Sequence, residues 1–274
     1  MSTSKQCFPL PALEYHLAHG CNLSCQQCSH YSNHHLAGAL PTVEDAQHEY
    51  SLWSHLLRPQ RFALLGGEPL LNPQIEQHIE LARRCWPDSQ LMLVTNGFLL
   101  HRFPGLPETL LRNKCQMEVS QHGTAAAYLE RFAEVKRLVW QWRVAYPGIT
   151  INIRRSHKQW MRQYRVEADV PLPFASKPNA AYKICLQRHC TQLADSALWK
   201  CPALAHFGKF EAKLQLHSLP QWQLFRDYQA CLHTCTDAEL RQFLDTASIP
   251  QCGLCPSKRI AFVHPDPLQR SPLK

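Results

Sequence analysis

The chain has 274 residues, of which 45% are hydrophobic, enough to bury a sizeable core in one large domain or one and a half. No apolar run approaches a membrane span and no signal peptide begins the sequence, so we expect a cytoplasmic protein without a membrane partner. The net charge of +8 does not by itself indicate nucleic acid, and 13 cysteines in a reducing compartment indicate metal binding rather than disulfides.

The first predicted strand, residues 13–17, leads directly into a cysteine triplet. Cys21, Cys25 and Cys28 form a C-x3-C-x2-C loop, which brings three thiolates round one small volume without a fourth ligand. Thiolates select iron–sulfur clusters or zinc, and a closed zinc site needs four ligands. The spacing therefore favours a [4Fe-4S] cluster with one open iron. The alternatives are a chance grouping, a zinc site completed by His30, or a disulfide with a spare thiol.

The next helix is expected to begin at Thr42, because Asp45 completes a capping pattern there. Its predicted inward residues are Tyr50, Trp53, Leu56 and Leu57. A second strand at residues 61–65 ends in four residues that form a second motif, Gly66, Gly67, Glu68 and Pro69. Glycines at a strand end allow close backbone approach to a ligand, and the carboxylate adds an acceptor.

The triplet and the GGEP segment behind it resemble the two signature motifs of the radical S-adenosylmethionine (SAM) enzymes. The resemblance implies that the open iron chelates the amino and carboxylate groups of SAM, and that Gly66, Gly67, Glu68 and Pro69 hold its amino group. The family often has an aromatic residue before the third cysteine, near the adenine. Gln27 stands there in this chain, so a backbone contact is expected but not stacking through the side chain.

Strands and helices continue to alternate, which predicts a parallel sheet of βα units. The expected elements are a helix from near residue 73 to 86, strands at 91–94, 116–120 and 149–153, and a helix over about 125–142. Ligands of such sheets bind at the carboxyl ends of the strands, where Asn96 and Ser120 fall. The family resemblance implies that both contact SAM, whereas a turn-forming and a strand-end role are the alternatives. The expected fold is α/β, a partial (β/α)6 barrel over residues 1–165.

A basic stretch leaves the fifth strand: Arg154, Arg155, Lys158, Arg162 and Arg165. If the stretch is helical, four of these side chains share one face beside the expected cavity. Arginines bind phosphates and carboxylates bidentately, so this face would hold an anionic substrate or, through Arg154, the SAM carboxylate. A solvated basic surface is the alternative.

Residues 166–274 are expected to form a second, cysteine-rich domain with its own metal site. A predicted hairpin, residues 191–202, and the later C-x2-C pair resemble the twitch domain, a shortened SPASM domain that carries one auxiliary [4Fe-4S] cluster. Its four ligands would be drawn from Cys185, Cys190, Cys201, Cys252 and Cys255. Cys190 is slightly favoured over Cys185 because it lies on the hairpin arm, although the family's spacing points to Cys185. Structural zinc is the alternative. Two such clusters would lower the net charge to about +5.

The resemblance implies an oxidoreductase or epimerase that splits SAM reductively and takes hydrogen from a small polar metabolite. A sugar or cyclitol is favoured, including phosphorylated or nucleotide-linked ones, with flavodoxin or ferredoxin as electron donor. Dehydrogenation would use the auxiliary cluster as electron acceptor, and epimerisation would need a thiol hydrogen donor, for which Cys115, Cys231 and Cys235 are candidates. A peptide-modifying enzyme ranks second, because only about twelve residues precede the first strand for leader recognition. A zinc-binding nucleic-acid module ranks third.

Overall fold

The computed structural model describes residues 7–36, 38, 40–262 and 265–269, and its centre is one mainly parallel sheet. Five strands follow the chain in order and pair in parallel: β1 (Phe8–His16), β2 (Leu57–Leu65), β3 (Gln90–Thr95), β4 (Gln116–Ser120) and β5 (Ile151–Arg154). This arrangement confirms the predicted α/β class, an open partial barrel followed by a cysteine-rich C-terminal region.

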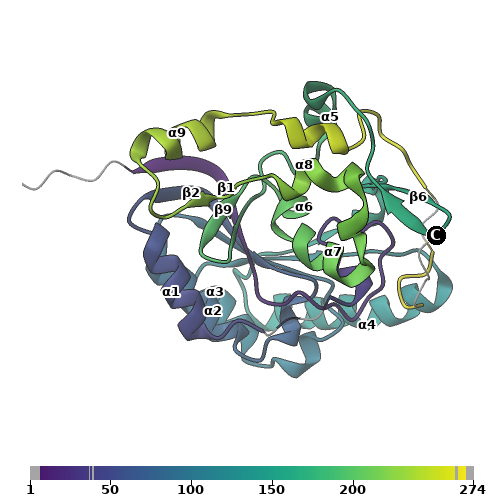
Figure 1. Cartoon of the computed structure of the whole chain (residues 1–274). Coiled ribbons are helices and arrows are strands. Elements are labelled where there is room, and N and C mark those ends of the chain that lie inside the picture. The colour runs from purple at the N-terminus through teal and green to yellow at the C-terminus, as the bar shows by residue number, and fades with distance from the viewer. Residues whose placement is uncertain (1–6, 37, 39, 263–264, 270–274) are drawn as a thin grey trace, which may run out of the picture.

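Helices connect these strands and cover one side of the sheet, below it in Figure 1. They are α1 (Val43–Trp53), α2 (Ile75–Cys85), α3 (Leu106–Arg112) and α4 (Ala126–Ala145). Thr42 and Asp45 form the predicted capping box. The helix ends earlier than expected, because Leu57 already begins β2 instead of facing inward from α1. No helix in the described part of the chain is long and apolar enough to cross a membrane.

The sixth parallel strand comes from the C-terminal part of the chain and joins the sheet beside β1, not beside β5. It is β8 (Thr191–Ala194), which forms the predicted hairpin with β9 (Ala197–Trp199), and β10 (Cys231–Leu232) completes that edge. The turn residues Asp195 and Ser196 both have positive φ, as a two-residue hairpin turn requires. One continuous sheet therefore includes strands from both predicted domains, and the boundary near residue 165 stays a prediction.

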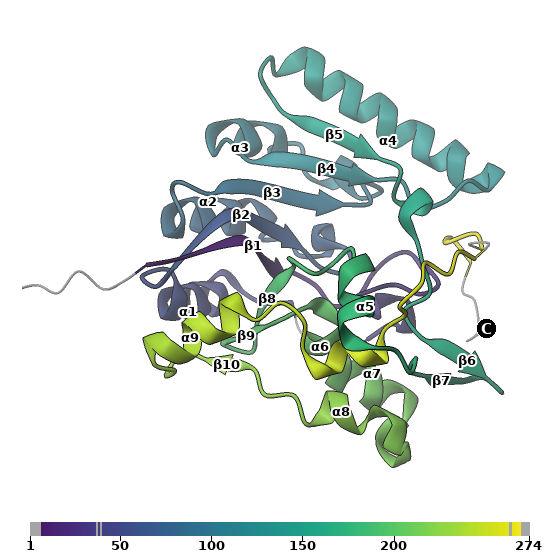
Figure 2. The same cartoon turned by 90° about the horizontal axis from the view of Figure 1, so that it is seen from above.

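The remaining elements gather at the end of the sheet formed by β1, β8, β9 and β10, as the view from above shows (Figure 2). The helices are α5 (Pro178–Ile184), α6 (Pro202–Ala205), α7 (Phe207–Leu214), α8 (Gln223–Arg226) and α9 (Asp237–Asp245), and β6 (Arg165–Glu167) pairs with β7 (Val170–Leu172). Thr236 and Glu239 cap α9 as predicted. Short 3-10 helices lie at Ser32–His34, Pro69–Leu71, Leu100–Arg102, Ser156–Gln159, Leu216–Ser218, Pro220–Trp222 and Pro250–Leu254.

The hypothesis of a basic helical face after β5 is wrong. Residues 154–165 form the end of β5, one 3-10 turn and the start of β6. Helical spacing therefore does not bring the five basic side chains onto one surface.

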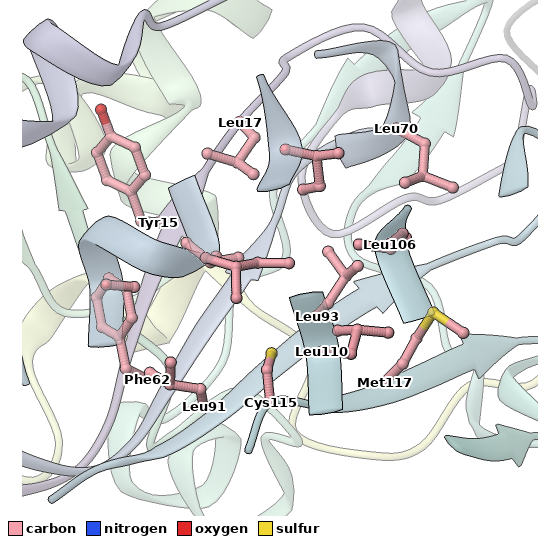
Figure 3. Close-up of a cluster of buried hydrophobic side chains, with 14 of the residues drawn as sticks. Tyr15, Leu17, Phe62, Leu70, Leu91, Leu93, Leu106, Leu110, Cys115 and Met117 are labelled. Carbon is pink, nitrogen blue, oxygen red and sulfur yellow. The ribbon is translucent and has the colours of Figure 1, made fainter. Parts of the chain in front are cut away.

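Two hydrophobic cores stabilise the fold. The larger core lies between the sheet and α1–α4, and Figure 3 shows part of it around Phe62, Leu93 and Met117. The smaller core joins Tyr31 and Leu36 to the C-terminal helices, with Tyr31 stacked on Phe210 at 4.1 Å between ring centroids. The second core therefore fastens the loop after the cysteine triplet to α7.

Candidate active site

A cavity of about 460 Å³ opens at the carboxyl ends of the parallel strands. It brings together most of the residues that the two motifs and the strand ends predicted. The predicted residues that line it are Cys21, Cys25, Cys28, Gly66, Gly67, Asn96, Ser120 and Arg154. All five candidate cysteines of the auxiliary site line the same cavity, namely Cys185, Cys190, Cys201, Cys252 and Cys255. The two cysteine sets are thus walls of one cavity.

Cys25 is buried and Cys21 and Cys28 are partly buried, and this burial raises the pKa of each thiol of the N-terminal triplet. Cys21 and Cys28 add to this effect on the pKa of Cys25, since each would place a like charge beside its thiolate. Backbone hydrogen bonds from His30, Ser32 and Asn33 to the Cys28 thiol act in the opposite direction on its pKa. The thiols are therefore neutral without a metal, and an iron–sulfur cluster would supply the positive charge that stabilises three neighbouring thiolates.

The spacing of the cysteines fits a multi-iron cluster better than a single zinc ion. A tetrahedral zinc with Zn–S bonds near 2.3 Å would hold its sulfur atoms about 3.8 Å apart. Among the described residues, the group that places three potential ligand atoms within 4.8 Å of one another is formed by histidines, and neither cysteine set does so. In an iron–sulfur cube each thiolate binds a different iron, which allows a wider spacing.

The two glycines of the GGEP segment are required by close packing against the cysteine loop. A Cβ on Gly66 would lie 2.3 Å from the carbonyl oxygen of Ala18, and one on Gly67 would lie 2.1 Å from that of Gly20. The Gly67 N–H donates to the Ala18 carbonyl at 2.8 Å. The close approach predicted from the glycines is therefore, in this structure, an approach to the backbone before Cys21.

Glu68 lies behind the cavity wall, and its carboxylate makes hydrogen bonds that stabilise the local structure. Its carboxylate accepts hydrogen bonds from Leu70 N at 3.1 Å, Thr95 Oγ1 at 2.5 Å and Asn96 N at 2.8 Å. Burial raises its pKa to about 7, and these three donors oppose that shift. Neither Glu68 nor Pro69 is among the described residues that line the cavity. The carboxylate thus joins the GGEP segment to the end of β3.

Asn96 connects that strand end to the first cysteine. Its Nδ2 donates to Asn22 Oδ1 at 2.6 Å and lies 3.8 Å from the Sγ atom of Cys21. Its Oδ1 accepts from Phe98 N at 3.0 Å, which is the turn contact that the alternative reading of Asn96 expected. Ser120, at the end of β4, is buried at the cavity wall.

Arg154 is the one residue of the predicted basic stretch that lines the cavity. Its Nε lies 3.0 Å from Glu118 Oε1 and 3.3 Å from Ser156 Oγ. Three further basic residues line the cavity, Arg61, Arg188 and Lys200, against the two acids Glu14 and Glu118. Sequence reasoning therefore identified one of the four basic residues of the lining, Arg154, and missed Arg61, Arg188 and Lys200.

Gln27 is a cavity residue whose contribution the sequence did not reveal. Its Oε1 accepts from Gln163 N at 2.7 Å and from Tyr164 N at 3.2 Å, which fastens the cysteine loop to the segment before β6. Its Nε2 is buried and has no hydrogen-bond partner among the described protein atoms. The residue adopts φ 60°, and nothing in the local sequence signals this conformation.

The second cysteine set divides into four thiols and one. The pKa of Cys255 is raised by burial and then by the neighbouring thiols of Cys201, Cys185 and Cys252. Cys190 instead hydrogen-bonds to Glu14, and after burial that carboxylate is the main cause of its raised pKa. The neighbours of each thiol therefore favour Cys185 as the fourth member of the auxiliary set, although Cys190 also lies near Cys185 and the sequence slightly favoured Cys190.

The three thiols considered as hydrogen donors do not line this cavity. Cys115 lies in the larger hydrophobic core (Figure 3), where burial raises its pKa to about 12. Cys231 and Cys235 lie with their Sγ atoms 3.3 Å apart in a separate hollow, which shares Lys200 with the cavity.

Residues 14–119 match a family model described as a 4Fe-4S single cluster domain. This match covers the cysteine triplet, the GGEP segment and the first four strands, and it supports the iron–sulfur prediction for that stretch. No curated protein matches the chain by sequence.

Solved structures with a similar backbone arrangement include three proteins. BtrN in complex with AdoMet and 2-DOIA is 14% identical over 91% of this chain and 93% of that one, with a TM-score of 0.46. AnSMEcpe with bound AdoMet is 24% identical over 53% of this chain, with a TM-score of 0.41, and the match spans only 43% of that protein. SuiB from Streptococcus suis bound to S-adenosylmethionine is 11% identical over 80% and 68%, with a TM-score of 0.34.

Proposed function

We propose that the chain is a radical SAM enzyme that removes a hydrogen atom from a small polar metabolite, such as a sugar or cyclitol. The observation that carries this proposal is the shared cavity, in which the buried triplet Cys21, Cys25 and Cys28 faces a second set of four thiols. The iron–sulfur family match over residues 14–119 supports the first half of the arrangement.

Cys21, Cys25 and Cys28 would hold the first cluster, and Cys185, Cys201, Cys252 and Cys255 the auxiliary cluster. When bound and reduced, the first cluster supplies the electron that splits SAM into methionine and a 5′-deoxyadenosyl radical, the species that takes hydrogen from substrate. A one-electron donor such as flavodoxin or ferredoxin would serve this step.

The chain's own residues would bind and orient SAM along the strand ends. Gly66 and Gly67 expose backbone at the cavity beside the triplet, and Asn96 and Ser120 offer polar side chains from the next two strands. Arg154, partly matched by Glu118, would attract a carboxylate, either that of SAM or that of the substrate. Glu68 and Pro69 would act indirectly, by fixing the loop that carries these contacts.

Basic side chains in the lining offer contacts for an anionic group on a polar substrate. Arg61, Arg154, Arg188 and Lys200 line the cavity beside Glu14 and Glu118. The two proposed clusters would add about three negative charges, so these basic residues would act as local partners of an anionic group and not through a net positive charge. Guanidinium groups bind phosphates and carboxylates bidentately, so a phosphorylated or nucleotide-linked sugar fits this lining.

A substitution at Cys190 would distinguish epimerisation from dehydrogenation. Once Cys185 is taken as the fourth ligand, Cys190 is a thiol in the cavity that belongs to neither cluster. An epimerase needs such a thiol to return a hydrogen atom to the substrate, whereas a dehydrogenase needs only an electron acceptor. Cys190→Ala should abolish deuterium incorporation from D2O if the product is an epimer and should leave an oxidised product unaffected.

The test uses anaerobically reconstituted protein with SAM and dithionite. We expect about eight iron atoms per chain and formation of 5′-deoxyadenosine. Cys25→Ala should abolish 5′-deoxyadenosine formation and reduce the iron to about four. Cys85→Ala, a cysteine of α2 outside both sets, is the matched control and should behave like the unsubstituted chain.

A colourless protein that contains zinc in place of iron, or an iron-loaded protein that leaves SAM intact, would overturn the proposal. A crosslinked or epimerised peptide product would support the peptide-modifying alternative. Tight salt-dependent binding to nucleic acid by a zinc form would support the third.

A further inference from the structure

Four histidines gather beside the cysteine loop, and one of them, His30, also lines the cavity. They come from three segments: His16 ends β1, His19 and His30 flank the triplet, and His206 lies between α6 and α7. One ligand atom from each of His16, His19 and His206 lies within 4.8 Å of the other two. The ring centroids of His30 and His16 are 4.8 Å apart.

The distances match those of a single bound metal ion. The Nε2 atoms of His16 and His206 are 3.2 Å apart. A tetrahedral ion with bonds near 2.05 Å to nitrogen holds its ligand atoms about 3.3 Å apart. No movement of these two rings away from each other is therefore needed to place an ion between them.

The surroundings keep the rings in the form that binds metals. His16 and His206 are both buried, and burial lowers their pKa values well below the ordinary range, helped by the neighbouring rings and by Lys209. Neutral imidazole is the metal-binding form. Without a metal ion, the two rings share one hydrogen bond between their Nε2 atoms. The Nδ1 atoms of both rings are buried without a partner among the described protein atoms, so that bond satisfies only part of the pair.

We propose that His16, His19 and His206, with His30 as the nearest further ligand, form a mononuclear site for a divalent transition metal ion of the Zn²⁺ type. Imidazole ligands suit zinc, and a closed structural site needs three or four of them. His16, His19 and His206 are not among the described residues that line the cavity, whereas His30 is. The metal site does not depend on the proposed reaction.

The ion would act as a clamp between the two halves of the chain. His19 lies two residues before Cys21 and His30 two residues after Cys28, so both ends of the cysteine loop would be fixed. His206 would attach the same ion to the start of α7, beside the smaller hydrophobic core. Zinc binding should therefore raise the thermal stability of the protein, because it stabilises the folded state alone.

The test adds one equivalent of Zn²⁺ to the cluster-loaded protein and measures metal content, the zinc K-edge X-ray absorption spectrum and Tm. We expect one zinc per chain with only nitrogen or oxygen neighbours near 2.0–2.1 Å, imidazole outer-shell scattering and unchanged iron. His206→Gln should weaken zinc binding at least about 100-fold and remove the rise in Tm, as the loss of one of few ligands predicts. His78→Gln is the matched control, since this buried histidine of α2 bonds to the Pro41 carbonyl instead.

Zinc–sulfur scattering near 2.3 Å, or zinc affinity unchanged by His206→Gln, would overturn the site. So would a protein that takes up no zinc. If His206→Gln reduces the iron content, the same measurements on His19→Gln, whose ring is partly exposed, decide instead. Formation of 5′-deoxyadenosine, followed in the same samples, reports on the proposed function independently of zinc.

Discussion

Glu68 is a buried carboxylate that organises the turn beside the cavity without lining it. Three donors, from Leu70, Thr95 and Asn96, converge on its two oxygens. A glutamine at this position would replace one carboxylate oxygen with an NH2 group. That group would face a hydrogen-bond donor instead of accepting from it. The family resemblance implied that Glu68 helps to hold the SAM amino group. Its contacts instead give it a role in fixing the loop that carries Asn96.

Glu68→Gln should lower the free energy of unfolding by about 1–3 kcal/mol, because at least one buried N–H or hydroxyl loses its acceptor. Urea denaturation of the reconstituted protein measures this change. Glu44→Gln, on the exposed first turn of α1, is the matched control and should change stability by less than about 0.5 kcal/mol. Full stability of Glu68→Gln combined with lost SAM binding would instead indicate direct contact with SAM.

Gln27 separates two roles within one side chain. Its Oε1 anchors the backbone of residues 163 and 164, while its Nε2 is buried and has no hydrogen-bond partner among the described protein atoms. Gln27→Glu retains the anchoring acceptor but replaces the donor with a second oxygen.

We expect Gln27→Glu to fold normally and to raise the KM for SAM or substrate about tenfold, since a ligand acceptor would lose one hydrogen bond. Gln27→Leu should in addition lower Tm, because it frees two backbone N–H groups. Steady-state kinetics and thermal unfolding of the pair measure the two roles separately. Equal KM values for Gln27→Glu and the unsubstituted chain would exclude the donor role.

At the scale of elements, the apolar pattern predicted the sheet because buried strands carry it most strongly. The strand at residues 116–120 and the hairpin were located within a residue or two, since each is bounded by clear turn residues. The beginnings of β1 and β2 were missed. Pro9 and Pro59 interrupt the pattern, and prolines argue against strands unless neighbouring pairing holds them. Here that pairing exists, because Leu10 lies opposite Pro59 in the parallel register.

The GGEP segment and the cysteine loop form one structural unit because backbone meets backbone there. Gly67→Ala would place a methyl group 2.1 Å from the Gly20 carbonyl oxygen, a contact that only a shift of the loop before Cys21 can relieve. We expect lower Tm, fewer iron atoms at the first site and weaker SAM binding. Calorimetry and iron analysis measure these effects.

Gly208→Ala is the matched control for that substitution. An added Cβ on this α7 residue has no atom within 4 Å, and alanine is the better helix former by about 1 kcal/mol. The variant should be at least as stable as the unsubstituted chain, with normal iron content. Normal iron content in Gly67→Ala as well would show that the close approach is not needed for the first site.

At the scale of the whole molecule, the sequence predicted both cysteine sets but not that they share a cavity. Their meeting depends on two contacts between distant segments: residues 13–15 of β1 pair with 191–193 of β8, and Tyr31 packs on Phe210. Local periodicity carries no information about either contact. The histidine cluster was missed for the same reason, since His206 approaches His16 only after the C-terminal half folds back.

The same long-range pairing decides which cysteine completes the auxiliary site. Glu14 of β1 lies opposite Gln192 of the neighbouring strand β8, and Gln192 Nε2 donates to its carboxylate at 2.6 Å. The Cys190 thiol also hydrogen-bonds to this carboxylate. A thiolate at Cys190 would lie beside the Glu14 carboxylate, which raises the pKa of the thiol more than the nearby Arg61 lowers it, and this disfavours Cys190 as a ligand. Cys185 instead has the other three auxiliary thiols as neighbours.

Cys185→Ala should therefore lose one cluster, about four iron atoms per chain, while Cys190→Ala keeps about eight. Iron and sulfide analysis with electron paramagnetic resonance of the reduced proteins measures the loss, and Cys115→Ala, buried in the larger core, is a control outside both sets. Both clusters retained in Cys185→Ala, with one lost in Cys190→Ala, would assign the hairpin-arm cysteine as the ligand. That result would also remove Cys190 as a hydrogen donor, so the iron count limits the chemistry before any substrate is identified.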